Sequence, residues 1–238
     1  MNLSIVVPVF NEPQTNIGDL YNRITGVCRS YEYGYEIIFV DDGSSNGISD
    51  FIKKLQYSDK NVRLIRFIKN CGQAKAFLAG FSFAKGDFII TMDSDLQYLP
   101  EEIPLFLEQV NSGHDVVGGK RPDSSRSLLS KFLAFYFSTF YGIRMKDHTC
   151  TYGVLSSGIA KKILKNQASV CIRHLAYIFG NNKTEIDITH CERKYGKTSY
   201  PLFKYLFHGA RYLFTFSKAQ KMGPDDFLKF DNICEQIA

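Results

Sequence analysis

Apolar segments alternate with segments of helical periodicity through the first 120 residues, and this order constrains the fold more than any other feature. The apolar segments cover residues 3–10, 35–45, 62–68, 87–95 and 115–119, and the helical patterns cover residues 16–31, 47–58, 72–84 and 100–113. Strands separated by helices are typical of βαβ units. We therefore expect an α/β fold with a mostly parallel sheet flanked by helices.

Acidic and amide side chains lie at the carboxyl ends of three of the expected strands. They form the pairs Asn11–Glu12, Asp41–Asp42 and Asp93–Asp95. Ligands of open α/β sheets bind beyond the carboxyl ends of the strands. We therefore expect these pairs to line one crevice.

The stretch TMDSDLQ, residues 91–97, places Asp93 and Asp95 two positions apart. Carboxylates this close repel each other, and the pKa of one rises unless a cation lies between them. Their hard oxygens suit Mg²⁺ or Mn²⁺, which keep water ligands and bridge substrate phosphates. Turn and cap residues form similar pairs, so the motif alone leaves both interpretations open. The sequence has neither a P-loop nor a GxGxxG motif, which argues against ATP-dependent phosphoryl transfer and dinucleotide chemistry.

The charge is unevenly distributed along the chain. Residues 1–119 contain 10 Lys and Arg against 15 Asp and Glu, whereas residues 120–238 contain 19 against 9. The basic second half predicts an anionic partner such as a phosphate or an acidic lipid, or else a solvated basic face. We expect no nucleic-acid partner, because no motif of interleaved aromatic and basic residues supports one.

The N-terminus and the cysteines indicate the compartment. Residues 1–10 have no basic n-region and no cleavage site, and the six cysteines have no zinc-binding spacing. No apolar run reaches the ~20 residues that a membrane span needs. We therefore expect a cytoplasmic protein with free thiols.

Two segments of the second half are candidates for membrane contact. Residues 127–143 are apolar on almost every side if helical, and residues 201–217 combine many aromatic residues with one basic stripe. A helix with a broad apolar face and a basic flank can lie in the membrane interface. A core or dimer helix has the same pattern, so this alternative stays open.

Five motifs, in order, resemble the inverting GT-A glycosyltransferases of family 2, and among them the polyprenyl-phosphate sugar transferases of the dolichol-phosphate mannose synthase type. They are IVVPVFNE, EIIFVDDGSSNG, the stretch from NCGQAKA through MDSDLQ to PEEIP, KDHTCTYGVLSS and RKYGKTSYPLFKYL. The resemblance covers roughly residues 3–217. It implies a Rossmann-like GT-A catalytic domain over residues 1–200 and, over residues 201–238, C-terminal amphipathic helices and a polar tail.

The resemblance also implies roles for single residues. The nucleotide would lie against Pro8, Phe10, Asn11, Glu12, Asp41, Asp42 and Asp93, with Asp41 accepting a hydrogen bond from the base and Ser44 shaping the turn. A divalent metal would be held by Asp93 and Asp95. The catalytic residues would be Asp95, Gln97 and Arg193, and Lys197 and Ser199 would help to neutralise phosphate on a closing loop.

Basic residues after the fifth expected strand are candidates for an acceptor phosphate. They are Lys120, Arg121, Arg126 and Lys131. Lysine and arginine hold phosphate as a point charge and as a two-pronged donor, respectively. Solvated surface residues would have the same pattern.

These features predict an enzyme that moves a sugar from a nucleotide-diphosphate sugar, with UDP as the expected nucleotide, to a polyprenyl phosphate. Inversion is expected, with Mg²⁺ or Mn²⁺ stabilising the leaving diphosphate. A lipid phosphate is already an anion and needs no strong base. A hydroxyl acceptor would need one, and Asp147 is the candidate.

Two alternatives remain: transfer to a glycan hydroxyl in cell-surface polysaccharide synthesis, and a non-catalytic partner subunit. The family pattern Lys-Asp-Pro-Thr-Ser-Gly-Phe-Arg departs here at His148, Cys150, Thr151 and Gly153, and the missing Arg leaves the acceptor open. We expect the protein in the cytoplasm or peripherally on the cytoplasmic face of the membrane. Its partner there would be the inner membrane surface or a membrane protein.

Overall fold

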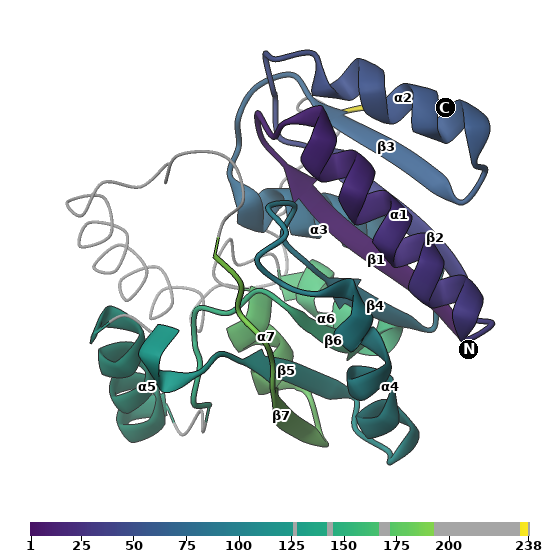
Figure 1. The fold of residues 1–238 in the computed structure, drawn as a ribbon. Coiled ribbons are helices and arrows are strands. Elements are labelled where there is room, and N and C mark those ends of the chain that lie inside the picture. Colours follow the sequence, from purple (N-terminus) through teal and green to yellow (C-terminus); the bar gives the residue numbers. More distant parts are fainter. Residues whose placement is uncertain (126–127, 142–144, 167–171, 193–233, 238) are drawn as a thin grey trace.

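The computed structural model describes residues 1–125, 128–141, 145–166, 172–192 and 234–237. Its centre is one eight-stranded sheet in the order β7-β5-β6-β4-β1-β2-β3-β8 (Figure 1). The strands are β1 Asn2–Val9, β2 Gly34–Asp41, β3 Val62–Phe67, β4 Phe88–Thr91, β5 Val116–Lys120, β6 Gly153–Ser156, β7 Lys183–Asp187 and β8 Cys234–Ile237. The expected α/β sheet is confirmed. It is mixed but mostly parallel, because β6 runs antiparallel between β4 and β5, and β8 antiparallel to β3.

Helices cover both faces of this sheet, so the fold has three layers. They are α1 Gln14–Ser30, α2 Ile48–Ser58, α3 Gln73–Phe83, α4 Ile103–Asn111, α5 Leu128–Tyr141, α6 Ser157–Asn166 and α7 Ile172–Phe179, with short 3₁₀ turns η1 Pro100–Glu102 and η2 Asp123–Ser125. Side chains of β1 alternate between the layers. Ile5 packs with the cluster that includes α1, α2 and α4, and Val6 packs with the cluster that includes α3, α6 and α7. A strand buried on both faces reads as a continuous apolar run, as residues 3–10 do.

The parallel register brings the expected site residues to one edge of the sheet. β1 pairs Val9 with Asp41 of β2, and it pairs Val6 with Thr91 of β4. Residues that follow these strands therefore begin at nearly the same level, on the carboxyl edge. This is where the polar pairs predicted from the sequence lie.

β6 lies between β4 and β5 and so joins the two parts of the sheet. Its backbone lies unusually close to the backbone of β5. A Cβ on Gly153 would lie 2.8 Å from the carbonyl oxygen of Val117. Only glycine allows so close an approach of two backbones. The Arg that the family pattern has at this position would not fit between these strands.

The expected C-terminal region is described only in part. Residues 234–237, expected within a polar tail, instead form β8 on the edge of β3. The expected amphipathic helix of residues 201–217 lies outside the described residues. The boundary expected at residue 200 lies outside them too and stays a prediction.

Candidate active site

The loop after β1 and the turn after β2 are bonded to each other. Asn11 has a φ of 54°, which asparagine tolerates better than most residues. Its backbone N–H donates to Ser44 Oγ at 2.8 Å, and its Oδ1 accepts the N–H of Ser45 at 2.9 Å. Phe10 beside it is 44% exposed, whereas Pro8 is buried within β1. The exposed ring and the fixed polar loop form a surface suited to a planar base.

Glu12 is held in the same loop. Its Oε2 accepts the side-chain N–H of Asn16 at 3.1 Å, and its carbonyl oxygen accepts the side-chain N–H of Asn46 at 2.9 Å. The loop is therefore tied both to the first turn of α1 and to the turn before α2.

Asp41 is fully buried and bonded within its own turn. Its Oδ1 accepts the N–H of Ser44 at 2.9 Å, and its Oδ2 accepts the hydroxyl of Ser49. Arg66 Nε lies 3.8 Å from that second oxygen. Asp41 thus closes the turn that ends β2. Its expected hydrogen bond to a base stays a prediction.

Asp42 ties β2 to the start of α3. Its two oxygens accept the backbone N–H groups of Cys71, at 2.6 Å, and Gly72, at 2.9 Å. Burial raises the pKa of Asp42, and these two hydrogen bonds oppose that rise. Gly43 has a φ of +75°, and a Cβ there would lie 2.5 Å from the carbonyl carbon of Lys69, so a glycine is needed where the two loops meet.

Asp93 and Asp95 lie at the centre of this edge, directly after β4. Asp95 is 6% exposed, and its Oδ1 accepts the N–H of Gln97 at 3.2 Å across a turn in which Leu96 has a φ of 62°. Burial and, next, the charge of Asp95 raise the pKa of Asp93 to about 6. The two carboxylates therefore lie close enough to repel each other, and a cation between them would relieve that repulsion.

Two residues that the sequence analysis did not propose as site residues, Gln73 and Thr151, bond to Asp93. Gln73 Nε2 donates to its Oδ1, and Thr151 Oγ1 donates to its Oδ2, each at 2.6 Å. Nothing in the sequence indicated that Gln73 belongs to the site beyond its place at the start of a helix. For Thr151 there was one indication, because Thr151 replaces the Gly of the family pattern.

Gln97 connects the site to the loop after β7. Its side-chain N–H donates to the carbonyl oxygen of Cys191 at 3.3 Å, and its carbonyl oxygen accepts the N–H of Cys191 at 2.9 Å. The expected site residues Arg126, Arg193, Lys197 and Ser199 lie outside the described residues.

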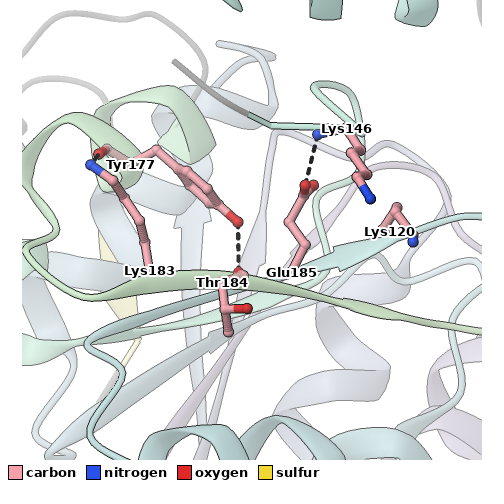
Figure 2. A pocket seen from close by; sticks show the side chains of 6 residues that line it. All are labelled: Lys120, Lys146, Tyr177, Lys183, Thr184 and Glu185. Carbon is pink, nitrogen blue, oxygen red and sulfur yellow. Dashed lines mark hydrogen bonds between the residues drawn. The ribbon is translucent and has the colours of Figure 1, made fainter. Parts of the chain in front are cut away.

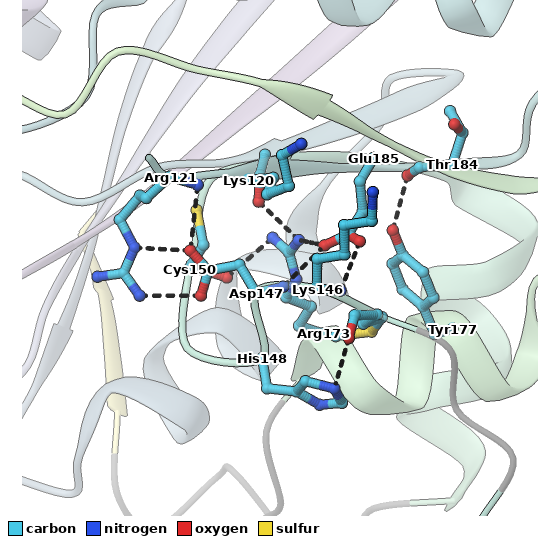
Figure 3. Close-up of polar contacts among 12 residues, drawn as sticks. Lys120, Arg121, Lys146, Asp147, His148, Cys150, Arg173, Tyr177, Thr184 and Glu185 are labelled. Carbon is cyan, nitrogen blue, oxygen red and sulfur yellow. Dashed lines mark hydrogen bonds and ion pairs between the residues drawn. The ribbon is translucent and has the colours of Figure 1, made fainter. Parts of the chain in front are cut away.

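Arg121 and Asp147 form a buried two-pronged ion pair (Figure 3). Arg121 Nε and Nη2 donate to the two oxygens of Asp147 at 2.8 and 2.9 Å, and Nη2 also donates to Thr149 Oγ1. Burial alone would raise the pKa of the fully buried Asp147, but Arg121 outweighs burial and holds that pKa well below its usual value. Such a carboxylate holds a proton poorly, which argues against Asp147 as a general base; its role with a hydroxyl acceptor stays a prediction.

Lys120 and Lys131 are the other described candidates for the acceptor phosphate. Lys120 Nζ contacts Asp187 at 2.7 Å and lines a cavity of about 300 Å³ with Lys146, Tyr177, Lys183, Thr184 and Glu185 (Figure 2). Lys183 Nζ donates to the carbonyl oxygen of Tyr177 at 2.6 Å, so part of the cavity's positive charge caps α7. Lys131 is exposed on α5.

The carboxylate pair has the ligand type that a divalent metal such as Mg²⁺ or Mn²⁺ prefers. No set of three His, Cys, Asp or Glu side chains gathers into a metal site within the described residues. A hard cation held by one or two carboxylates completes its shell with water and substrate phosphates. Asp93 and Asp95 offer carboxylate oxygens of the kind that such an ion prefers.

Comparison with known proteins now identifies the family. The profile described as "Glycosyl transferase family 2" matches residues 4–179. The chain belongs to glycosyl transferase family 2. The matched residues include the loop after β1, the turn after β2 and the Asp93–Asp95 pair.

Relatives in this family include undecaprenyl-phosphate 4-deoxy-4-formamido-L-arabinose transferases from Salmonella paratyphi A and Salmonella dublin. Each is 36% identical over 208 residues, which are 85% of this chain and 63% of the relative. The chain therefore spans less than two thirds of the length of these curated relatives.

Solved structures share the fold of this family 2 chain at low sequence identity. Mannosyl-3-phosphoglycerate synthase from Rubrobacter xylanophilus gives a TM-score of 0.70 at 11% identity, over 97% of this chain and 79% of that one. Glucosyl-3-phosphoglycerate synthase from Mycobacterium tuberculosis, in complex with Mn²⁺, UDP-glucose and phosphoglyceric acid, gives 0.68 at 12% identity, over 94% and 81%. The GT-A, Rossmann-like fold expected from the sequence is confirmed.

Proposed function

We propose that this protein moves a sugar from a nucleotide-diphosphate sugar to a polyprenyl phosphate, with inversion and with a divalent metal. The observation that carries the proposal is the likeness to transferases whose name states undecaprenyl phosphate as the acceptor. The donor side is supported by the fold shared with an enzyme seen with UDP-glucose and Mn²⁺. UDP is the nucleotide that we propose first.

The side chains of the site have distinct tasks in this reaction. Asp95, supported by Asp93, would hold Mg²⁺ or Mn²⁺, which supplies Lewis-acid stabilisation of the leaving diphosphate. Phe10 and Asn11 would hold the nucleotide, and Gln97 would orient the sugar or the acceptor. An oxygen of the lipid phosphate attacks the anomeric carbon from the face opposite the diphosphate, so one bond forms, one breaks and the configuration inverts.

The acceptor phosphate needs cations but no base. Lys120 ends β5 and Arg121 follows it, and we propose that these two residues, with Arg126 and Lys131, attract the acceptor phosphate. Because the guanidinium of Arg121 is paired with Asp147, we propose that Arg121 attracts the acceptor phosphate through its charge and does not bind it with two hydrogen bonds. The lowered pKa of Asp147 in this pair argues against it as the base for a glycan hydroxyl, which supports the phosphate acceptor over that alternative.

α5 supplies the described surface best suited to an acidic membrane. Phe132 is 55% exposed and Phe135 is 67% exposed, beside the exposed Lys131. Aromatic side chains next to a cation suit the lipid interface. No helix in the described ranges is long and apolar enough to cross a bilayer. We propose that the protein reaches its lipid acceptor from the cytoplasmic surface.

Thermal unfolding with UDP, GDP or CDP, each with and without Mn²⁺, tests the donor site first. A ligand at about 100 times its dissociation constant adds roughly 2.7 kcal/mol of stability, which gives a clear shift. We expect a Mn²⁺-dependent shift with one nucleotide, lost in Asp95→Asn and kept in Asp50→Asn, a matched change on the exposed start of α2. Transfer from the matching sugar nucleotides to undecaprenyl phosphate is then measured. No shift with any nucleotide would favour the non-catalytic partner subunit instead.

A further inference from the structure

The carboxylate of Asp93 is held from two sides by neutral donors. Gln73 is the first residue of α3, and Thr151 precedes β6, so the two donors come from elements on either side of β4 in the sequence. Their hydrogen bonds to Oδ1 and Oδ2 are both 2.6 Å long. Gln73 thus holds one carboxylate oxygen of Asp93 and Thr151 holds the other, so the carboxylate plane has little freedom to rotate.

Each donor is in turn anchored to the sheet. Thr91, the last residue of β4, donates its hydroxyl to the carbonyl oxygen of Thr151 at 2.6 Å. Asp42, at the end of β2, accepts the N–H groups of the two residues that precede Gln73. The arrangement therefore connects the ends of β2 and β4 through the start of α3 and the start of β6.

The chemistry of the donors matters as much as their position. An arginine or lysine bonded to Asp93 would fix it but would also neutralise it, and the pair would then have less need of a cation. An amide and a hydroxyl fix the carboxylate and leave its charge in place. Hydrogen bonds of this kind orient metal-binding groups in many proteins, and losing one typically lowers metal affinity by about 10–100-fold.

We infer that Gln73 and Thr151 are positioning residues that hold Asp93 relative to Asp95 for the metal and diphosphate of the donor. This inference rests on the proposed function, since it presumes a donor at this edge. It gives a task to Thr151, where this chain departs from the Gly of the family pattern: glycine has no hydroxyl to donate. Neither residue would touch the reacting atoms.

Binding of Mn²⁺ with UDP, GDP and CDP, measured by calorimetry on the full chain, tests the inference independently of turnover. Thr151→Val keeps the shape of the side chain and loses the hydroxyl. We expect it to weaken binding of the Mn²⁺–nucleotide pair about tenfold. Thr151→Ser, which restores a hydroxyl, should bind nearly as well as the unchanged protein. Thr139→Val, the same substitution on the exposed side of α5, should bind equally well.

Gln73→Met provides a second variant that does not depend on the buried side of the site, since Gln73 is exposed. We expect a similar loss, and a larger one when it is combined with Thr151→Val. Binding by both single variants equal to that of Thr139→Val would overturn the positioning roles and leave the donor site intact. No binding by the unchanged protein would overturn the proposed function, and this inference with it.

Discussion

The acidic residues of the carboxyl edge share a chemical type and differ in their partners. Asp42 accepts two backbone N–H groups and holds a loop. Asp147 faces the guanidinium of Arg121 and balances a buried charge. Asp93 accepts hydrogen bonds from two neutral donors, and burial and the neighbouring Asp95 raise its pKa to about 6 against the opposing charge of Arg121. The partner, and not the residue type, decides whether a carboxylate supports the fold or is left to bind a cation.

Asp147→Asn should therefore reduce stability. The substitution keeps the shape of the side chain but leaves Arg121 buried without its counter-charge, and breaking a buried pair in this way costs about 3 kcal/mol or more. Asp187→Asn is the matched control, because Asp187 is 80% exposed against Lys120 and surface pairs contribute about 1 kcal/mol or less. Urea unfolding measures both. A stable Asp147→Asn protein that had lost only its transfer activity would restore Asp147 as a catalytic base.

The sequence was sufficient to predict part of this site, because ligands of open α/β sheets bind beyond the carboxyl ends of the strands. Asp41, Asp42, Asp93 and Asp95 could be placed together because each follows a recognisable strand. The donors to Asp93 could not, because Gln73 lies 20 residues before it and Thr151 lies 58 residues after it. Contacts over such separations depend on how the chain returns to the sheet, and no local pattern encodes that return.

The same limit applies to the elements. β1, β2, β3 and β5 were predictable because each contains an apolar core of β-branched or other apolar residues between turn signals. β6 has only four residues, and its antiparallel place between β4 and β5 follows from tertiary pairing. β7 is half-exposed at the sheet edge and has no apolar run to mark it.

α5 is connected to the sheet through two buried histidines. His148 Nδ1 lies 2.6 Å from His174 Nε2, and His148 Nε2 lies 3.0 Å from the carbonyl oxygen of Met145. The ring of Phe137, from α5, packs at 5.4 Å from His148 and 4.4 Å from His174. Burial lowers the pKa of His148 to about 4 and that of His174 well below its usual value, so both rings are neutral in the folded protein.

This pair should make the folded protein sensitive to acid. The pKa of His148 is lower in the folded than in the unfolded chain, so its contribution to stability is present above about pH 6.5 and is lost as pH falls towards 4. The loss for His148 amounts to about 3 kcal/mol, from a difference of about 2.5 pKa units. Urea unfolding between pH 4 and 8 measures it. His148→Gln should reduce this dependence by the share of His148 and leave the share of His174. His114→Gln, a partly exposed control, should not change it. Equal slopes in all three proteins would contradict the argument.

At the scale of the whole molecule, the two halves of the chain meet at one sheet edge with different charge. The acidic first half contributes the turns and the carboxylate pair, which suit a metal-bound nucleotide. The basic second half contributes Lys120, Arg121 and α5 on the side of β5 and β7 (Figure 1). A metal-bound donor and an anionic acceptor could thus approach this edge from different sides. The uneven charge of the sequence would then correspond to two different sides of the site.

Membrane binding is the consequence of this asymmetry that can be measured directly. Replacing Phe132 and Phe135 of α5 with Ser removes two exposed rings, and losing about 1.5 kcal/mol or more of apolar burial should weaken binding to anionic phosphatidylglycerol vesicles at least about tenfold. Tyr57→Ser is the control, because Tyr57 is an aromatic residue 84% exposed on α2. Vesicle sedimentation at low and high salt separates the apolar from the charged contribution, since salt weakens only the latter. Unchanged binding by the double variant would contradict a role of α5 and direct the search to residues 201–217.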